Sequence, residues 1–208
     1  MPRNLSPVEV ADFRRRLCAV AERMFAERGP QGVTMRELAR ELGVSAMTPY
    51  RYFKDKDSIL AAVRAAAFDD FAAALEQAAL IRGNAAERAD AVGRAYLDFA
   101  FSRPAAYRLM FDLSQPDDAR FPELERAGAR ARRTMTGYME ALVTGGFLAG
   151  DPETLGQIFW ATVHGLVMLQ LAGKLHPKPD FATLHRNATS LLARGAQAVS
   201  QLNRRRAS

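Results

Sequence analysis

Cysteines and long apolar runs are scarce in this chain of 208 residues. Cys18 is the only cysteine, so no disulfide can form within the chain, which fits a reducing compartment. With no second cysteine to resolve it, Cys18 is expected to be a small structural residue rather than a redox switch. The N-terminus is polar, and no apolar run approaches the roughly 20 residues that span a bilayer. We therefore expect a soluble cytoplasmic protein without a membrane partner.

Motifs that carry chemistry are also missing. The sequence shows no nucleophile with a base, no carboxylate pair and no glycine-rich loop of the kind that cradles phosphates. Its three histidines, His164, His176 and His185, lack the close paired spacing of metal ligands, and no Glu-x-x-His pattern accompanies them. We expect no metal, no cofactor and no enzyme activity. A helical-bundle enzyme is the disfavoured alternative.

Helical signals dominate the chain and strand signals are few. Alanine is enriched, which favours helix. Capping residues and first-turn prolines predict where helices begin. These markers are Ser6, Thr34, Asn84, Pro104, Pro122 and Asp151. The pattern predicts an all-α fold of about nine helices.

The segment from Thr34 to Leu60 predicts two short helices joined by a tight turn. Thr34 and Glu37 form a capping box that begins the first helix. Gly43 ends it by supplying left-handed backbone. Ser45 then caps a second helix expected over residues 46–53. This arrangement is a helix-turn-helix, in which the second helix is the candidate recognition helix for DNA.

Positive charge is concentrated toward the N-terminus. Residues 1–56 hold eleven Lys and Arg against seven Asp and Glu, whereas residues 57–203 hold fifteen against sixteen. A basic N-terminal domain favours a polyanionic partner, although a GC-rich genome would also give an arginine-rich composition. We expect a three-helix DNA-binding domain over residues 1–56. Residues 57–208 are expected to form a larger helical domain for ligand binding and dimerisation.

Two parts of the chain resemble known regulators. The first sixty residues resemble the DNA-binding domain of TetR/AcrR transcriptional regulators, on Phe25, Gly29, Val33, Thr34, Leu38, Ala39, Gly43 to Ser45, Tyr50, Phe53, Lys56, Ile59 and Leu60. Trp160, His164 and Gly165 resemble the C-terminal domain that one TetR subgroup is named after, and residues 103–111 fit that subgroup too.

The chain departs from the TetR pattern at two positions of the predicted recognition helix. Tyr52 stands where the family often has His, and Pro49 stands where a small or aliphatic residue is common. A tyrosine can still donate to a phosphate. Pro49 has no amide proton to donate, so we expect it in the first turn of its helix.

The DNA contacts can be assigned by residue type and by the resemblance. The start of a recognition helix faces base edges, and an arginine there could pair with guanine. By resemblance, Tyr50, Tyr52 and Lys56 hold phosphates, and Thr34 lies at a helix start suited to the same work. The predicted DNA-binding set is Thr34, Ser45, Ala46, Met47, Thr48, Tyr50, Arg51, Tyr52, Lys54 and Lys56. Alternatively, Tyr50 packs into the core beside Phe53, and Lys54 is only solvated.

A homodimer is expected because one head makes too few contacts for a specific site. Two heads would read half-sites about 34 Å apart on a double-stranded, palindromic operator. The last two helices are the expected interface, and by resemblance they form a four-helix bundle with those of the second copy. Their apolar residues are Leu155, Ile158, Phe159, Val163, Leu166, Val167, Leu169 to Leu171, Leu184, Leu191, Leu192 and Val199. The alternative is that these residues only close the core of one chain.

The larger domain is rich in aromatic side chains that could line an apolar ligand cavity. The candidates are Phe68, Phe71, Tyr96, Phe101, Tyr107, Met110, Phe111, Tyr138, Trp160, His164 and Met168. Each could instead be a core residue. Trp160 and His164 are one helical turn apart and share a face, which the resemblance makes a candidate pocket wall. His164 could make a structural hydrogen bond, contact a ligand or, least expected, bind a metal.

Together these features predict a homodimeric, ligand-responsive transcriptional regulator of the TetR type. We expect a repressor that leaves its operator when a small apolar or aromatic effector of unknown identity binds. The alternative is a DNA-binding regulator whose larger domain binds a protein partner and no small molecule. A well-formed cavity would favour the first, and a filled core the second.

Overall fold

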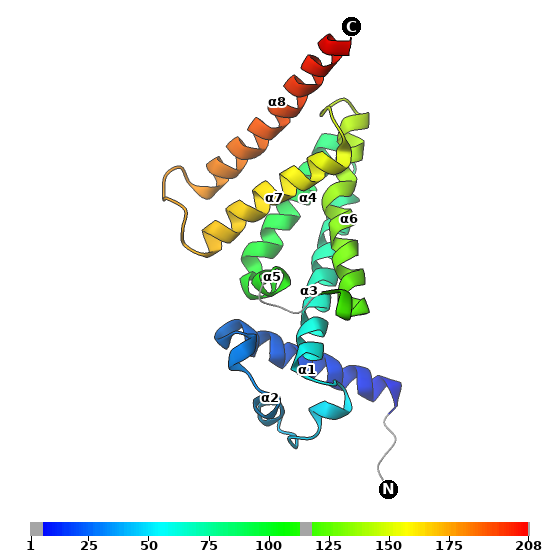
Figure 1. Ribbon diagram of the computed structural model, residues 1–208, viewed down its shortest axis with the longest axis vertical. Helices are drawn as coiled ribbons and strands as arrows, with labels where there is room; N and C mark the ends of the chain where they lie inside the picture. The colour runs from blue at the N-terminus through cyan, green and yellow to red at the C-terminus, as the bar shows by residue number, and fades with distance from the viewer. Residues whose placement is uncertain (1–5, 113–117, 208) are drawn as a thin grey trace. The chain divides into compact units, whose positions relative to one another are not determined.

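The computed structural model describes residues 6–112 and 118–207, with the backbone alone for residues 118 and 199–207. These described residues form eight α-helices and three short 3-10 helices, with no strand among them (Figure 1). The predicted all-α fold is confirmed. The chain divides into two compact units. Unit 1 is Met1–Asp70 and Ala105–Ala129, and unit 2 is Phe71–Pro104 and Arg130–Ser208.

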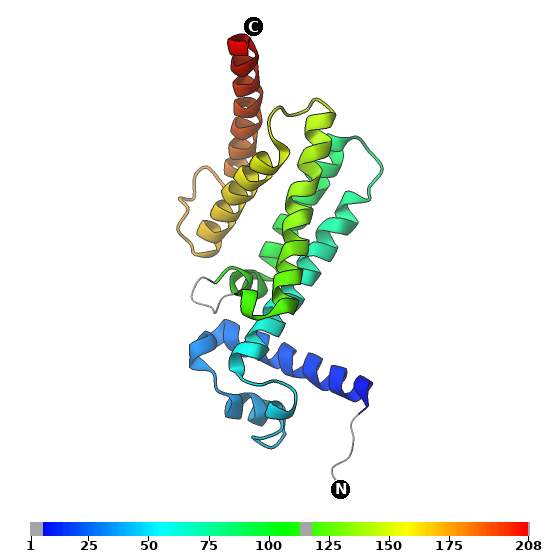
Figure 2. The ribbon, with the colours of Figure 1, turned by 45° about the vertical axis from the view of Figure 1, so that its right-hand side comes forward.

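Unit 1 is built around the N-terminal helices (Figure 2). Its elements are α1 (Pro7–Arg28), η1 (Pro30–Gly32), α2 (Met35–Glu41), η2 (Pro49–Arg51), the first part of α3 (Lys56–Ala79), most of α5 (Pro104–Met110), η3 (Asp118–Arg120) and the start of α6 (Pro122–Thr144). Ser6 and Glu9 form a capping box at the start of α1, and Gly29 ends it with φ 70°. Leu17, Phe25 and Leu38 meet in a core from which water is excluded.

The predicted second helix of the helix-turn-helix is wrong in its type. Residues 46–53 contain no α-helix; they form turns and the single 3-10 turn η2. Pro49 explains the difference, because it lacks the amide that would donate to the Ser45 carbonyl one α-turn earlier. The Thr48 amide donates to that carbonyl instead, at 2.9 Å. The predicted turn before it is confirmed, since Gly43 has φ 67°.

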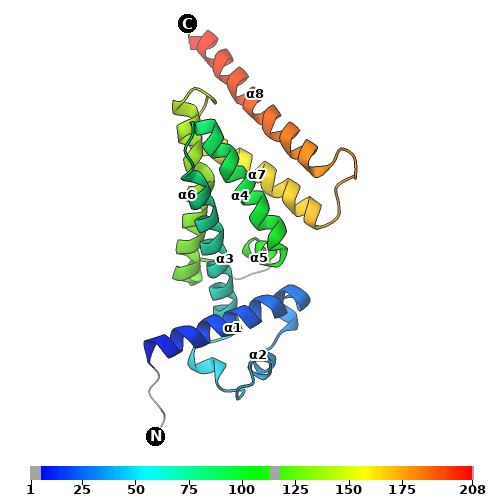
Figure 3. The ribbon, with the colours of Figure 1, turned by 180° about the vertical axis from the view of Figure 1, so that it is seen from behind.

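Unit 2 contains the longer helices. Its elements are the end of α3, α4 (Ala85–Ser102), the rest of α6, α7 (Pro152–Leu171) and α8 (Phe181–Ala207). Asn84 and Glu87 form the predicted capping box of α4, and Asp151 caps α7 as expected. Helix α7 packs against both α8 and α4, as Figure 3 shows from behind. The two ends of the Arg130 guanidinium donate to the Glu76 carboxylate at 2.9 and 2.6 Å, which joins α6 to α3.

Helix α3 belongs to both units. It begins at Lys56, beside the predicted domain boundary at residues 56 and 57, and it continues unbroken through Asp70 and Phe71. Residues 105–129 join unit 1 although they lie far along the chain. The domain boundary itself stays a prediction.

Candidate nucleic-acid interface and effector cavity

The segment after α2 presents side chains of the predicted DNA-reading set to solvent. Met47 is 68% exposed and Tyr50 is 48% exposed. Ala46 and Arg51 are exposed as well. The Ser45 and Thr48 hydroxyl groups lie 2.9 Å apart, so they share a hydrogen bond within the turn. Phe53 is buried, whereas the exposure of Tyr50 does not fit the alternative in which Tyr50 packs into the core beside Phe53.

Thr34 uses its hydrogen-bond donors within unit 1. Its hydroxyl and its backbone amide both donate to Glu37 Oε2 at 2.8 Å, and Arg28 donates to Glu37 Oε1 at 2.8 Å. These bonds, first of all those from Thr34, lower the pKa of Glu37 to about 2. The arrangement secures the start of α2. A phosphate contact by Thr34 stays a prediction, and it would compete with the Glu37 carboxylate.

Tyr52 is held by α1. Its ring stacks on Phe13 with 4.1 Å between ring centroids, and its carbonyl oxygen accepts a 2.7 Å hydrogen bond from Arg14. The Arg14 guanidinium also lies 4.1 Å from the Phe53 ring centroid. The residue at the family's His position is therefore fixed against the first helix, with its ring half-buried.

Lys56 is attached to the loop before α2. Its Nζ donates to the Pro30 carbonyl oxygen at 2.6 Å, and the side chain is half-buried. Lys54 is exposed. The lysine that resembles a phosphate-binding residue thus has a partner within unit 1, while keeping two further ammonium protons for other acceptors.

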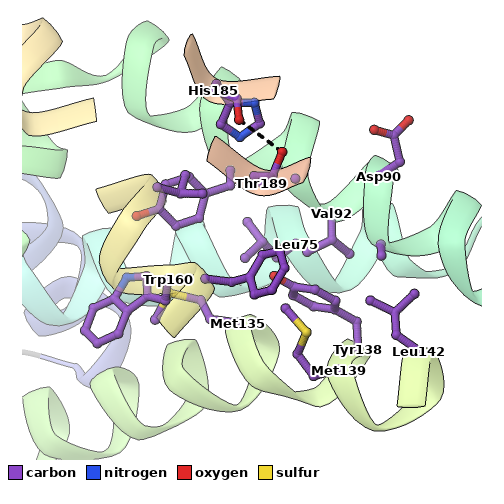
Figure 4. A pocket seen from close by; sticks show the side chains of 15 residues that line it. Leu75, Asp90, Val92, Met135, Tyr138, Met139, Leu142, Trp160, His185 and Thr189 are labelled. Carbon is purple, nitrogen blue, oxygen red and sulfur yellow. Dashed lines mark hydrogen bonds between the residues drawn. The ribbon is translucent and has the colours of Figure 1, made fainter. Parts of the chain in front are cut away.

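A cavity of about 190 Å³ lies within unit 2. Residues of α3, α4, α6, α7 and α8 line it, and Figure 4 shows their side chains. Its lining is mostly apolar, as small-molecule sites usually are. The lining residues are Leu75, Ala89, Asp90, Val92, Gly93, Tyr96, Met135, Tyr138, Met139, Leu142, Phe159, Trp160, Val163, His185 and Thr189.

Few polar groups reach this cavity, and none is a buried charge. Burial raises the pKa of Tyr138 to about 12, so its hydroxyl stays protonated. Burial lowers the pKa of His185, which favours the neutral ring, although nearby Asp90 acts in the opposite direction. The Thr189 hydroxyl donates to the His185 carbonyl at 3.0 Å. The Asp90 carboxylate points away from the other lining side chains and pairs with Arg94 (Figure 4).

The structure brings only part of the predicted ligand set together. Tyr96, Tyr138 and Trp160 line the cavity. Phe71 lies directly behind Tyr96, in an edge-to-face contact with 5.2 Å between centroids. Phe101 makes a similar contact with Phe181 at 4.9 Å and is 38% exposed. The other predicted ligand residues belong to unit 1 and do not line this cavity. Phe68 and Tyr107 each make an edge-on ring contact with Phe111, and Met110 is buried.

His164 and Met168 lie further along α7 than the cavity-lining Trp160 and Val163. The His164 ring centroid is 6.0 Å from that of Trp160. Burial lowers the pKa of His164, so the neutral ring is favoured there as well. A ligand contact by either residue stays a prediction.

Sequence reasoning missed several lining residues, above all His185 and Thr189. They lie one turn apart on α8, so a face with two polar groups among apolar neighbours was visible in the sequence. All of α8 had been assigned to the dimer interface. Met135, Met139 and Leu75 carried no signal that separates a cavity wall from a filled core.

An apolar surface remains exposed on the last two helices. Ile158 is 43% exposed, Leu169 45% and Leu191 62%. Phe147, which lies between α6 and α7, is 42% exposed. A shallow groove between α7 and α8 connects part of this surface. Its lining includes Leu155, Ile158, Leu191 and Leu192, all members of the predicted dimer set.

Neither a membrane-spanning helix nor a metal site is found among the described residues. No described helix is both long and apolar enough to cross a membrane. No group of three or more His, Cys, Asp or Glu side chains lies close enough to hold a metal ion in that same part of the chain.

Curated relatives match parts of the chain. An HTH-type transcriptional regulator of Mycobacterium tuberculosis is 24% identical over 132 residues, 62% of this chain and 56% of the relative. One from Staphylococcus aureus is 35% identical over 51 residues, 24% of this chain and 28% of the relative. The chain thus matches little more than half of the length of the longer-matching relatives.

Solved structures share the fold over nearly the whole chain. A Rhodococcus protein of unknown function is 27% identical with a TM-score of 0.76, covering 94% of this chain and 98% of the other. The Bacillus subtilis transcriptional regulator FadR, solved with stearoyl-CoA, is 18% identical with a TM-score of 0.71, covering 86% and 97%. At such identity the second likeness shows the fold alone.

Two family models match, one to each end of the chain. Residues 17–63 match the model of bacterial regulatory proteins of the tetR family. Residues 89–192, half of the chain, match the model described as a tetracyclin repressor-like C-terminal domain. Membership of the Trp-His-Gly subgroup stays a prediction. With both models in their expected order on an all-helical chain, this protein belongs to the TetR family of bacterial regulators.

Proposed function

We propose that this chain is a DNA-binding transcriptional regulator, released from its operator by a small effector that binds the cavity of unit 2. The observation that carries the proposal is the exposed segment after α2. The side chains of Met47 and Tyr50 are exposed there, and the helix before them begins at the Thr34 capping box. Both side chains are therefore accessible to a partner. They lie in the segment that the sequence predicts to read DNA, and DNA is the partner that we propose for it.

The contacts follow from residue chemistry. Met47 and Thr48 can meet a thymine methyl group, and Arg51 can pair with a guanine edge. Tyr50 and Lys56 are proposed phosphate contacts, which set orientation and affinity rather than sequence preference. Ser45, Ala46, Tyr52, Lys54 and Thr34 complete the proposed interface.

We propose a homodimer joined through α7 and α8. The exposed side chains of Ile158, Leu169 and Leu191 support this, because an apolar surface of this kind is covered in most stable assemblies. A second copy meets the same surface with the same residues, as a two-fold interface requires. The two heads then read the two halves of a palindromic operator.

Release by an effector depends on α3. Leu75 of this helix lines the cavity, and Lys56 at its other end bonds to Pro30. A ligand that prefers one packing of α3 over another changes the equilibrium between DNA-binding and released states. The formed cavity supports this effector mechanism over a regulator that binds only a protein partner. An enzyme gains no support, since the matching models and curated relatives are regulators.

The test is a genomic operator selection with the purified protein. Fragmented DNA from the source organism is incubated with it at near-physiological salt, and the recovered fragments are sequenced. We expect one or a few palindromic sites beside genes, with half-sites about one DNA turn apart. Recovery without enrichment of any sequence would overturn the proposal.

A further inference from the structure

We infer that the effector is a neutral molecule of a single aromatic ring carrying one hydrogen-bond acceptor, held by the Tyr138 hydroxyl. This inference rests on the proposed function, because it names the chemical class of the ligand for the same cavity. Four properties of the cavity carry it: size, lining, charge and the position of its polar group.

Size restricts the ligand to about one ring. The cavity holds about 190 Å³. A cavity of roughly 150 Å³ in another protein accommodates benzene, whereas pockets for drug-sized ligands reach roughly 300–1,000 Å³. A substituted benzene therefore fits the volume observed, which is smaller than that of pockets for drug-sized ligands.

The lining favours an aromatic ligand. Tyr96, Tyr138, Phe159 and Trp160 contribute rings from three different helices. Met135 and Met139 add thioether groups, which adapt to an inserted ring and make favourable contacts with it. Edge-to-face and offset contacts with such a lining add to the burial of apolar area.

The cavity offers no ionised partner to a charged ligand. Tyr138 stays protonated and the neutral form of His185 is favoured, for the reasons given above. Asp90 is the only acidic lining residue, and its carboxylate is turned outward and paired with Arg94 (Figure 4). Burying an ion without a partner is costly, so a neutral ligand is preferred over a carboxylate or an amine of the same size.

Tyr138 supplies the polar contact. Its side chain reaches from α6 into the middle of the lining residues (Figure 4). Within the described part of the chain its hydroxyl has no hydrogen-bond acceptor. The hydroxyl group of another polar lining residue, that of Thr189, donates to the His185 carbonyl oxygen. A ligand oxygen within reach of the Tyr138 hydroxyl can accept its proton, and an apolar ligand of the same shape cannot form this hydrogen bond.

Calorimetric titration of the full chain tests the class with three compounds of equal non-hydrogen atom count. Acetophenone has the ring and the acceptor, α-methylstyrene replaces the oxygen by a methylene group, and benzoate carries a charge. We expect acetophenone to bind about 3- to 10-fold more tightly than α-methylstyrene, and benzoate to bind at least about tenfold more weakly than acetophenone. Equal affinities, or tightest binding of benzoate, would overturn the inference.

Substitutions locate the binding site. Tyr138→Phe is expected to lower acetophenone affinity about 3- to 10-fold and to leave α-methylstyrene unchanged. Gly93 lines the cavity, and a Cβ placed on it meets no atom within 4 Å. Gly93→Leu should therefore fill the space and abolish binding of both compounds, while Gly93→Ala retains it. Trp160 is the only tryptophan, so ligand-induced change of its fluorescence reports occupancy of this site.

These readouts need no DNA, which separates the inference from the proposed function. If an operator is recovered but acetophenone does not bind, the ligand class is wrong and the regulator remains. If binding persists unchanged in Tyr138→Phe and Gly93→Leu, the compound occupies another site and the inference fails. Should Gly93→Leu not fold, the Tyr138→Phe comparison still decides.

Discussion

Gly156 of α7 lies directly against Thr136 of α6. A Cβ placed on Gly156 would stand 2.7 Å from Thr136 Cγ2 and 3.1 Å from its Cα. The two helices approach so closely here that only glycine fits. Phe159 and Trp160 follow on α7 and line the cavity together with Tyr138 of α6. The Gly156 contact therefore joins two helices that both contribute to the cavity lining.

Gly156→Ala is expected to destabilise the protein and to alter the cavity. Part of the obstruction is the Thr136 backbone, which cannot rotate away, so the helices must separate. We expect a loss of about 1–3 kcal/mol in the free energy of unfolding, together with a changed Trp160 emission. Chemical denaturation followed by fluorescence measures both.

The matched control is Gly137→Ala, next to Thr136 on α6. A Cβ at Gly137 meets nothing within 4 Å, and the residue is exposed. Alanine should stabilise the helix there by about 0.5–1 kcal/mol. Equal effects of the two substitutions would show that the Gly156 contact does not constrain the helices.

Lys56→Ala should change both folding and DNA binding. Loss of the hydrogen bond to the Pro30 carbonyl is expected to cost about 1–2 kcal/mol of stability. If Lys56 also holds a phosphate, the slope of log affinity against log salt concentration should fall by about 1. Binding is measured by fluorescence anisotropy on the selected operator across a range of salt concentrations.

Lys174→Ala serves as the control for the Lys56 experiment. Lys174 is exposed in the loop before α8 and belongs to unit 2. Its loss should leave both the stability and the salt slope as they are. A Lys56→Ala protein that loses stability but keeps the original slope would assign Lys56 to the structure of unit 1 alone.

Stability should decrease as the pH falls below 6.5. Burial lowers the pKa values of His164 and His185 from 6.5, so the folded state binds these protons less readily than the unfolded chain. Above pH 6.5 both histidines are neutral in the folded and in the unfolded chain, so their protonation does not reduce stability. Below pH 6.5 the unfolded chain takes up protons first, and the free energy of unfolding decreases. The lowered pKa of Glu37 acts in a separate window, below 4.5.

Substituting both histidines tests this assignment. In the variant His164→Gln, His185→Gln, the thermal midpoint should fall less than in the original chain as the pH decreases from 6.5. The loss below 4.5 should remain, because Glu37 keeps its hydrogen bonds to Thr34. An unchanged slope in the upper window would assign the effect to other groups.

Local signals in the sequence predicted the helix boundaries well. The capping boxes at Ser6, Thr34 and Asn84 depend on residues three positions apart, so they are complete in the sequence. Pro49 is also evident in the sequence, but the prediction of its effect on the helix was wrong. It was expected in a helical first turn, whereas the loss of its amide leaves only a 3-10 turn.

The cavity could not be predicted in the same way, because its walls come from five helices. Phe68 and Phe71 are three residues apart on α3 and carry identical side chains. Phe68 meets Phe111 in unit 1, and Phe71 meets Tyr96 in unit 2. Tyr138 and His185 reach one cavity from helices far apart in the chain. Only tertiary packing distinguishes a cavity wall from a filled core.

Leu191→Asp is expected to convert the proposed dimer to monomers. Leu191 is 62% exposed on α8, and in a two-fold interface the substitution places a carboxylate on both copies. We expect the dissociation constant of the dimer to rise more than about tenfold, with a parallel loss of operator affinity. Leu80→Asp is the control, since Leu80 is 73% exposed in the same unit but follows α3, outside the α7 and α8 surface. Sedimentation velocity should show monomers for the first variant and dimers for the second. If both variants sediment as dimers, the interface lies elsewhere, and the exposed leucine on α8 must have another role.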